Sequence, residues 1–371
     1  MDKMYVEDCC QILDSMRVPI TASDRKEGEY PYYGANGIQD YVADYIFDDE
    51  LVLLAEDGGN FESKERPIAY RVSGKCWVNN HAHVLKPKEG LDVDYLCYSL
   101  MFYNVDGMVN GATRKKLTQA AMRKMQIPSR SMDEQKFIAD ELNRIIKIKE
   151  QRQQELQLLD NLIKARFVEM FGDPELNPMG WEQVTLNDVC SSIVRGPFGS
   201  ALKKEFFVEP DETTYKVYEQ KHAIQKSASI GTYYITEEKY QELKRFECLP
   251  GDILMSCSGT MGELYQLPDG CEKGVINQAL CKFTLNERIL PICFLVYMKQ
   301  TIGNLETKGS GIQNIAAVSY VKQMPINLPP MDVQNEFEQF VHQVDKSKVA
   351  IQKALDEAQQ LFDSLMQEYF G

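Results

Sequence analysis

Basic, amide and hydroxyl side chains gather in turn-rich stretches of this 371-residue chain. Lysine and arginine can bind phosphate oxygens or the O6 and N7 atoms of guanine, and asparagine and glutamine can pair bidentately with adenine. We therefore predict contacts with nucleic acid, although an ordinary solvated loop side chain remains the alternative for each residue. The candidates are Arg114, Lys115 and Lys116 in the first half of the chain, and Arg195, Lys203, Lys204, Ser258, Thr260, Lys308, Gln313 and Asn314 in the second.

Catalytic motifs are absent or weak. The sequence has neither the Gly-rich loop and Asn/Asp-Pro-Pro-Tyr/Phe motif expected of an adenine methyltransferase nor a Walker loop. A nuclease pattern could be read into Asp49 and Glu62-Ser63-Lys64, but the corresponding Glu263-Leu264-Tyr265 lacks the lysine. We therefore expect no catalytic residues and no cofactor in this chain.

The ten cysteines form no Cys-x-x-Cys pair and are scattered through apolar stretches, as expected of buried free thiols in a reducing compartment. His81 and His83 alternate on a probable strand, but no cysteine or carboxylate stands at ligand spacing from them, so we predict no metal site there. The sequence contains no apolar run of membrane-spanning length and no apolar signal-peptide core. We expect a cytoplasmic protein that does not associate with membranes.

The net charge of −14 argues against a general affinity for nucleic acid. About half of the excess negative charge lies in residues 127–173 and 326–371, and residues 174–325 are close to neutral. Such a chain could contact base edges locally but lacks the positive field that gives non-specific binding. Tight DNA binding would therefore need a more basic partner.

Two stretches repeat each other and must position the candidate residues. Residues 127–173 overlay residues 326–371 without a gap, pairing Gln135 with Gln334 and Phe171-Gly172 with Phe370-Gly371. In the first copy, Ser131 and Glu134 have capping-box spacing, and Gly172 followed by Pro174 predicts a helix end. About 40 helical residues would extend for roughly 60 Å.

Apolar residues in both copies follow an alternating four-three spacing that forms a narrow stripe, which needs a partner stripe to become buried. The other copy is the simplest partner, so we predict an intramolecular coiled coil. Lys149 and Lys348 interrupt the two stripes at matching places. Either their stems line the seam while the ammonium groups reach water, or a polar pair fixes the register or meets a partner protein.

The segments before each copy share a pattern of elements. Strands are predicted at Leu51 to Ala55 and Lys75 to Leu85, and a helix at 93–104. In the second segment, Leu249 to Ser256, Gly274 to Phe283 and Pro291 to Lys299 follow in the same order. Antiparallel helices would hold two similar lobes apart, as suits duplex DNA with two half-sites and an unread spacer.

The chain resembles the specificity subunits of type I restriction-modification systems over nearly its full length. The resemblance rests on Phe171-Gly172-Asp173-Pro174 with Asn177-Pro178-Met179-Gly180-Trp181, on Leu249 to Leu254, on Gly309 to Ile315, on Leu328 to Gln334, and on Tyr32 to Gly37. It implies a non-catalytic subunit that reads a bipartite double-stranded DNA target, sets the spacer with its helices, and binds two methyltransferase subunits, to which motor-nuclease subunits add.

The predicted fold is α+β. Two globular mixed α/β target recognition domains, at 1–126 and 174–325, are separated by two long helices, at 127–173 and 326–371, that form an antiparallel intramolecular coiled coil. Two alternatives remain: a two-lobed coiled-coil scaffold that binds proteins, favoured mildly by the acidic charge, and a specificity subunit of a type II-like fused methyltransferase-nuclease.

Overall fold

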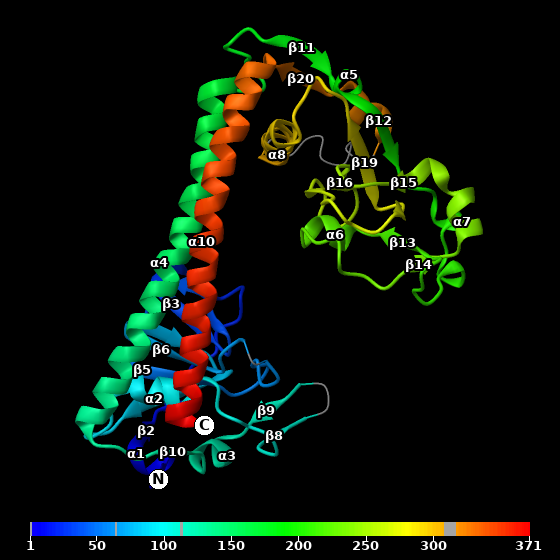
Figure 1. Ribbon diagram of the computed structural model, residues 1–371. Helices are drawn as coiled ribbons and strands as arrows, with labels where there is room; N and C mark the ends of the chain where they lie inside the picture. Colours follow the sequence, from blue (N-terminus) through cyan, green and yellow to red (C-terminus); the bar gives the residue numbers. More distant parts are fainter. Residues whose placement is uncertain (1, 64, 112–113, 308–316) are drawn as a thin grey trace. The chain divides into compact units, whose positions relative to one another are not determined.

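The computed structural model describes residues 2–63, 65–111, 114–307 and 317–371 (Figure 1). Its two compact units are discontinuous in sequence. Unit 1 contains residues 1–154 and 351–371, and unit 2 contains residues 155–350. Each unit therefore combines one globular lobe with half of each long helix.

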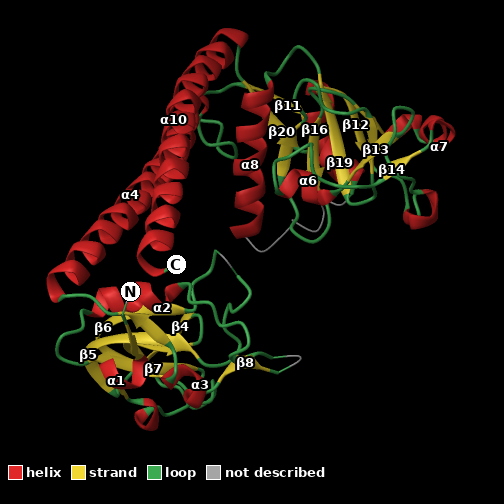
Figure 2. Ribbon diagram, turned by 60° about the horizontal axis from the view of Figure 1, so that its bottom comes forward, coloured by secondary structure: helices red, strands yellow, loops and turns green. Residues whose placement is uncertain are grey.

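The lobe of unit 1 is built on a six-stranded mixed sheet with the strand order β2-β7-β5-β6-β3-β4. Its strands are β2 (Cys10–Ile12), β3 (Glu27–Gly34), β4 (Gly37–Val42), β5 (Phe47–Ala55), β6 (Ala69–Val78) and β7 (Ala82–Pro87). Leu51 to Ala55 are completely buried, as predicted for an apolar run in a central strand. Helix α2 (Val93–Met101) packs on β5 and β6 (Figure 2).

Short elements complete this lobe. They are β1 (Lys3–Tyr5), α1 (Val6–Cys9), η1 (Asp14–Met16), β8 (Val109–Asn110), β9 (Lys116–Leu117), α3 (Gln119–Arg123) and β10 (Gln126–Pro128). Strand β1 pairs with β10, and β8 pairs with β9. The β1–β10 pair joins the start of the lobe to the entry of the first long helix.

The lobe of unit 2 contains two four-stranded sheets, with the orders β12-β19-β16-β17 and β14-β13-β18-β15, and the separate pair β11-β20. Its strands are β11 (Glu182–Thr185), β12 (Cys190–Arg195), β13 (Tyr215–Tyr218), β14 (Tyr234–Ile235), β15 (Glu247–Cys248), β16 (Ile253–Ser256), β17 (Leu264–Gln266), β18 (Gly274–Ile276), β19 (Leu280–Leu285) and β20 (Pro325–Leu328). Its helices are α5 (Leu186–Val189), η2 (Gly199–Ala201), η3 (Lys204–Phe206), α6 (Gln220–Ile224), α7 (Glu237–Glu242), η4 (Lys244–Phe246), α8 (Pro291–Thr307) and α9 (Val318–Gln323).

The long helices are α4 (Met132–Phe171) and α10 (Met331–Phe370). The predicted cap of α4 is present, since the Ser131 amide donates to Glu134 Oε2 over 2.9 Å. Gly172 ends the helix with a φ of +80°, a conformation that glycine adopts without strain. Among the described residues, no helix is both long and apolar enough to span a membrane.

Within each unit the two helices run antiparallel. In unit 1, Ile138, Leu142 and Ile145 of α4 share a core with Phe362 of α10. In unit 2, the shared core contains the following residues of the two helices: Ile163, Phe167, Phe171, Phe337, Val341 and Val344. Apolar side chains of both helices are therefore buried within each unit, as the four-three spacing predicts, and Phe167 and Phe171 lie outside the predicted stripe.

Two predicted boundaries in the first lobe are wrong. The expected strand at 75–85 is split between β6 and β7, because Asn79 turns the chain, and its Oδ1 accepts from the His81 amide over 2.8 Å. The expected helix at 93–104 ends at Met101. In the second lobe, the expected strand at 274–283 is likewise split, between β18 and β19 of different sheets, whereas β16 and α8 follow in the predicted order.

Candidate nucleic-acid interface

Arg114, Lys115 and Lys116 lie together beside the loop that follows β5. Arg114 Nη2 donates to Asp57 Oδ1 over 2.9 Å, Lys115 pairs with Glu62, and Lys116 Nζ lies 2.9 Å from Glu56 Oε1. A backbone hydrogen bond also joins the two segments, since the Leu117 amide donates to the Glu56 carbonyl over 2.7 Å. The basic segment is thus fixed to a second loop of the lobe.

A shallow hollow of about 410 Å³ lies between these two loops. Arg114 and Lys115 line one side, and residues 58–63 line the other. The lining residues include two cationic side chains, one carboxylate, and the polar side chains of Asn60 and Ser63. Such a mixture of donors and acceptors is suited to polar recognition of a phosphate or a base edge.

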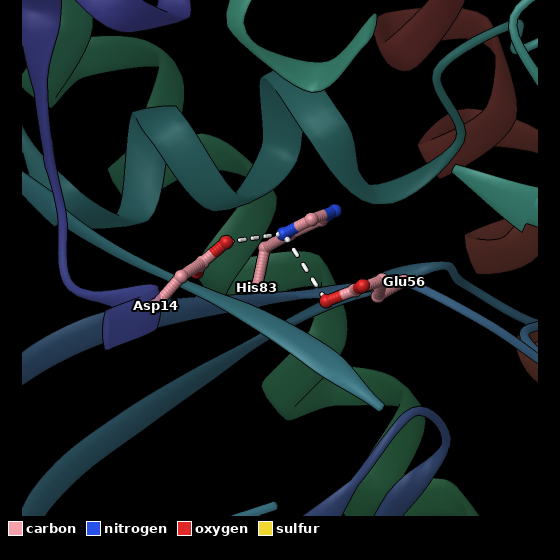
Figure 3. Close-up of side chains that lie close together, drawn as sticks. All are labelled: Asp14, Glu56 and His83. Carbon is pink, nitrogen blue, oxygen red and sulfur yellow. Dashed lines mark hydrogen bonds and ion pairs between the residues drawn. The ribbon is translucent and has the colours of Figure 1, made fainter. Parts of the chain in front are cut away.

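Beneath Lys116 is a buried cluster of Asp14, Glu56 and His83 (Figure 3). Both carboxylates point toward the same ring nitrogen: His83 Nδ1 lies 2.7 Å from Asp14 Oδ2 and 3.7 Å from Glu56 Oε2. The other nitrogen, Nε2, lies 2.9 Å from the Leu117 carbonyl oxygen. The cluster therefore connects the central strands to the backbone of the basic segment.

Hydrogen-bond partners surround both nitrogens of His83. A carbonyl oxygen can only accept, so Nε2 donates to Leu117, while Nδ1 faces the two carboxylates. Arg17 contacts both carboxylates, with its Nη2 3.5 Å from Asp14 Oδ2. The two carboxylates thus face the cations of Arg17 and Lys116 and the ring of His83 inside the lobe.

The cations hold the two carboxyl groups in their ionised form. Burial raises the pKa of Asp14, but the hydrogen bond and positive charge of His83 outweigh it, and the pKa lies below its usual value. Burial likewise raises the pKa of Glu56, and the hydrogen bonds from Arg17 and Lys116 more than reverse it. Both groups are therefore charged at neutral pH.

These three side chains could offer metal ligands, since their donor atoms lie within 4.8 Å of one another. The donors already have other partners: His83 Nε2 lies 2.9 Å from the Leu117 carbonyl oxygen, Arg17 binds both carboxylates, and the amide of Val84 and the side chain of Gln119 donate to Asp14. The set fits an ion-pair network better than a metal. The sequence-based view that His83 has no partnering carboxylate is nevertheless wrong, because Asp14 and Glu56 reach it from distant parts of the chain.

The suggested nuclease residues do not form a site. Asp49 and the loop containing Glu62 lie at opposite ends of β5, about 20 Å apart along the strand. Asp49 pairs with Lys86, and Glu62 pairs with Lys115. Lys64 lies outside the described residues.

In unit 2, three of the predicted residues lie around the segment 277–280. Arg195 Nε donates to the Gln278 carbonyl over 3.2 Å, and the amide of Cys257, next to Ser258, donates to the Ala279 carbonyl over 2.7 Å. The Thr260 carbonyl accepts from Ser256 Oγ over 2.6 Å, which closes the same loop. The loops before η2 and after β16 are therefore braced on one segment.

The other predicted residues of unit 2 are less closely grouped. Ser258 Oγ donates to Gln220 Oε1 over 2.8 Å, which ties its loop to α6. Lys203 lies 3.6 Å from Glu205, and Lys204 begins η3; both are exposed. Lys308, Gln313 and Asn314 lie outside the described residues.

Comparison with known proteins identifies the class to which this fold and these paired lobes belong. The family model of the type I restriction modification DNA specificity domain matches residues 1–158 and 178–359. The chain therefore belongs to the family of type I restriction-modification specificity subunits.

Individual relatives agree with this assignment. A Haemophilus influenzae protein provisionally described as a type I restriction enzyme specificity subunit is 28% identical over 347 residues, which cover 89% of this chain and 84% of that protein. The Escherichia coli EcoprrI specificity subunit is 26% identical over 121 residues, 31% of this chain and 28% of its own length.

Solved structures share the fold. The S subunit of the M. genitalium type I system has a TM-score of 0.56 at 13% identity, with 100% of this chain and 96% of that chain covered. A chain from a structural study of type I complex assembly and conformational transition has a TM-score of 0.59 at 14% identity, with coverages of 100% and 97%.

Proposed function

We propose that each unit reads one half of a bipartite double-stranded DNA target for a type I restriction-modification complex. The main supporting observation is a repeated backbone frame beneath different loops. The Asn79 turn of unit 1 has a counterpart at Asn277, whose Oδ1 accepts from the Ala279 amide over 3.0 Å. Asn79 and Asn277 also donate their amides to Tyr33 and Tyr218 in the adjacent parallel strands. One frame with two sets of loop side chains suits two different half-sites.

The long helices, in this proposal, form an antiparallel coiled coil that fixes the spacer between the half-sites. Two polar contacts related by the sequence repeat support a defined register. In unit 1, Lys149 donates to Gln359; in unit 2, Lys348 pairs with Asp160, and the 199-residue repeat interchanges the two pairs. These contacts favour the view that the two lysines fix the register of the helices over the view that their ammonium groups only reach water. Adding whole turns to both helices should lengthen the unread spacer, and an unchanged spacer would refute the role.

Methyltransferase subunits would bind along the same helices. Leu162 of unit 2 and Leu361 of unit 1 are equivalent in the repeat, and they remain 46% and 52% exposed. An apolar residue repeated at equivalent exposed places supports one partner subunit at each. Catalysis would belong to these partners and to any motor-nuclease subunits that join them in the cytoplasm.

Methylome sequencing tests the proposed function. A host that expresses this chain with its methyltransferase partner is compared with the same host lacking the chain. We expect one bipartite methylated motif, interrupted by unread base pairs, to disappear with the chain. An unchanged methylome in the presence of active methyltransferase would favour the protein-binding scaffold instead.

A further inference from the structure

Phe198 stands out among the described residues of unit 2, because its side chain is 91% exposed. It follows β12 directly after Arg195, Gly196 and the buried Pro197. Isolated apolar residues on a surface are common, but an almost fully exposed phenylalanine beside candidate DNA-binding residues is not explained by packing.

The backbone around Phe198 is held in place from both sides. The Gly196 amide donates to the Leu280 carbonyl over 3.0 Å, and a Cβ atom at Gly196 would lie 1.8 Å from the Asn277 carbonyl oxygen. The Ala201 amide donates to the Phe198 carbonyl over 2.9 Å. Glycine is thus required for the close approach to the turn that precedes β19, and these contacts hold the backbone from which the exposed ring projects.

Positive side chains flank the ring in sequence. Arg195 lies three residues before it, and Lys203 and Lys204 follow within six residues. Arg195 is braced on the carbonyl of Gln278, the same segment that supports the loop after β16. A segment that combines an exposed aromatic ring with nearby cationic residues has the composition of surfaces that contact phosphates and bases together.

We propose that Phe198 is an apolar wedge that stacks against the bases of the half-site read by unit 2, partly unstacking one base step. This inference rests on the proposed DNA-reading function and identifies one contact within it. Aromatic side chains stack on bases of any sequence, and inserted apolar residues kink the duplex at deformable steps. The wedge would favour a flexible step in the second half-site without a hydrogen bond to it.

The test uses the complete complex of this chain with its methyltransferase subunits and a duplex carrying the motif found by methylome sequencing. 2-Aminopurine, which brightens when it unstacks, is placed in turn at steps within each half-site. Wild-type complex should raise its fluorescence at one step of one half-site only. Phe198→Ala should abolish that rise and weaken binding at least 10-fold, whereas Phe198→Trp should retain both.

Two measurements separate stacking from other roles. Because the ring touches no phosphate, Phe198→Ala should leave the salt dependence of binding unchanged, whereas Lys203→Ala should reduce it. Leu176→Ala serves as the matched control, since Leu176 is 79% exposed in the same unit but lies in the junction after α4. It should bind as wild type does.

Three results would overturn the wedge. Phe198→Ala could bind and unstack as wild type does, or it could reduce assembly with the methyltransferase in sedimentation experiments while the assembled complex binds normally. Wild-type complex that binds the target with no fluorescence rise in either half-site would also exclude it. If assembled wild-type complex failed to bind the motif at all, the proposed function itself would fail.

Discussion

The two lobes place different chemistry at equivalent positions of a shared frame. In unit 1, Asp14, His83 and Glu56 form a buried charged network. In unit 2, Arg195 pairs with Cys281 of β19 at the places that Asp14 and His83 occupy in unit 1. Cys257 directly follows β16, and Glu56 directly follows β5 in the same way. The amides of Glu56 and Cys257 even donate to equivalent carbonyls, those of His81 and Ala279.

This contrast shows which part of the lobe is constant and which part varies. Backbone hydrogen bonds maintain the frame, whereas the side chains beneath the loops differ in charge, size and polarity. Ion pairs hold the basic segment of unit 1 from below, and thiols with an arginine occupy the corresponding space in unit 2. The same backbone hydrogen bonds therefore support different side chains in two lobes whose sheets differ in strand number and order.

The largest effect should follow from breaking the network of unit 1. Asp14→Ala leaves His83 and Arg17 without one of their anions in the interior, and it should lower the free energy of unfolding of unit 1 by about 3 kcal/mol. In unit 2, Cys281→Ala at the position equivalent to His83 removes only a small buried thiol and should cost about 1 kcal/mol. Urea denaturation of the two variants measures both costs. Equal losses would mean that the lobes do not differ in this way.

Recognition by the two units should be separable. Arg114 lies in the hollow of unit 1, so Arg114→Ala should weaken binding to the full target about 10-fold, equivalent to about 1.4 kcal/mol, through the first half-site alone. Titrations with duplexes altered in one half-site or the other provide the measurement. On a duplex whose first half-site is scrambled, the variant and the wild type should bind equally. A persistent difference there would show that Arg114 acts outside the first half-site.

Acid should weaken unit 1 through its paired carboxylates. The folded pKa of Glu56 is lowered, so its ion pairs stabilise the fold fully above the unfolded value of about 4.3 and lose this effect as the pH falls through the folded value. Glu56→Gln should therefore be less stable than wild type at pH 7, and the difference should shrink below about pH 4. Thermal denaturation across this range tests the sign. A difference that grows in acid would contradict the network.

The smallest effect concerns the repeated polar contacts of the helices. Lys348 and Asp160 are partly exposed, so Lys348→Ala should cost only about 0.5 kcal/mol. Lys149→Ala should cost a similar amount, because its contact with Gln359 is the repeat-related copy. Chemical denaturation gives both values. A loss above about 2 kcal/mol for one lysine alone would show that the two contacts are not equivalent.

Local signals in the sequence predicted the long helices well. The Ser131–Glu134 box, Gly172 and the apolar stripe depend on residues a few positions apart, so spacing alone identifies them. The Asp14–His83 contact joins residues 69 positions apart, and only the pairing of β2 with β7 brings them together. Contacts between distant residues cannot be read from local spacing, so Lys149 was recognised as a seam residue while its partner Gln359 was not.

The candidate interface stays a prediction. Arg114, Lys115 and Lys116 could be proposed from the sequence because basic residues in a turn are visible in composition. Their ion pairs with Asp57, Glu62 and Glu56 could not be predicted, since these acidic residues belong to another loop. The close approach of Gly196 to Asn277, next to the exposed Phe198, likewise joins residues far apart in sequence, and no pattern in the sequence indicates it.

Exchange of one lobe tests the central claim most directly. Residues 174–325 are replaced by the corresponding lobe of another specificity subunit with a known target, and the host methylome is sequenced with the same methyltransferase partner. Our account predicts that one half of the bipartite motif changes to that of the donor, while the other half and the spacer length stay the same. A change in both halves, or in neither while methylation persists, would contradict the assignment of one half-site to each unit.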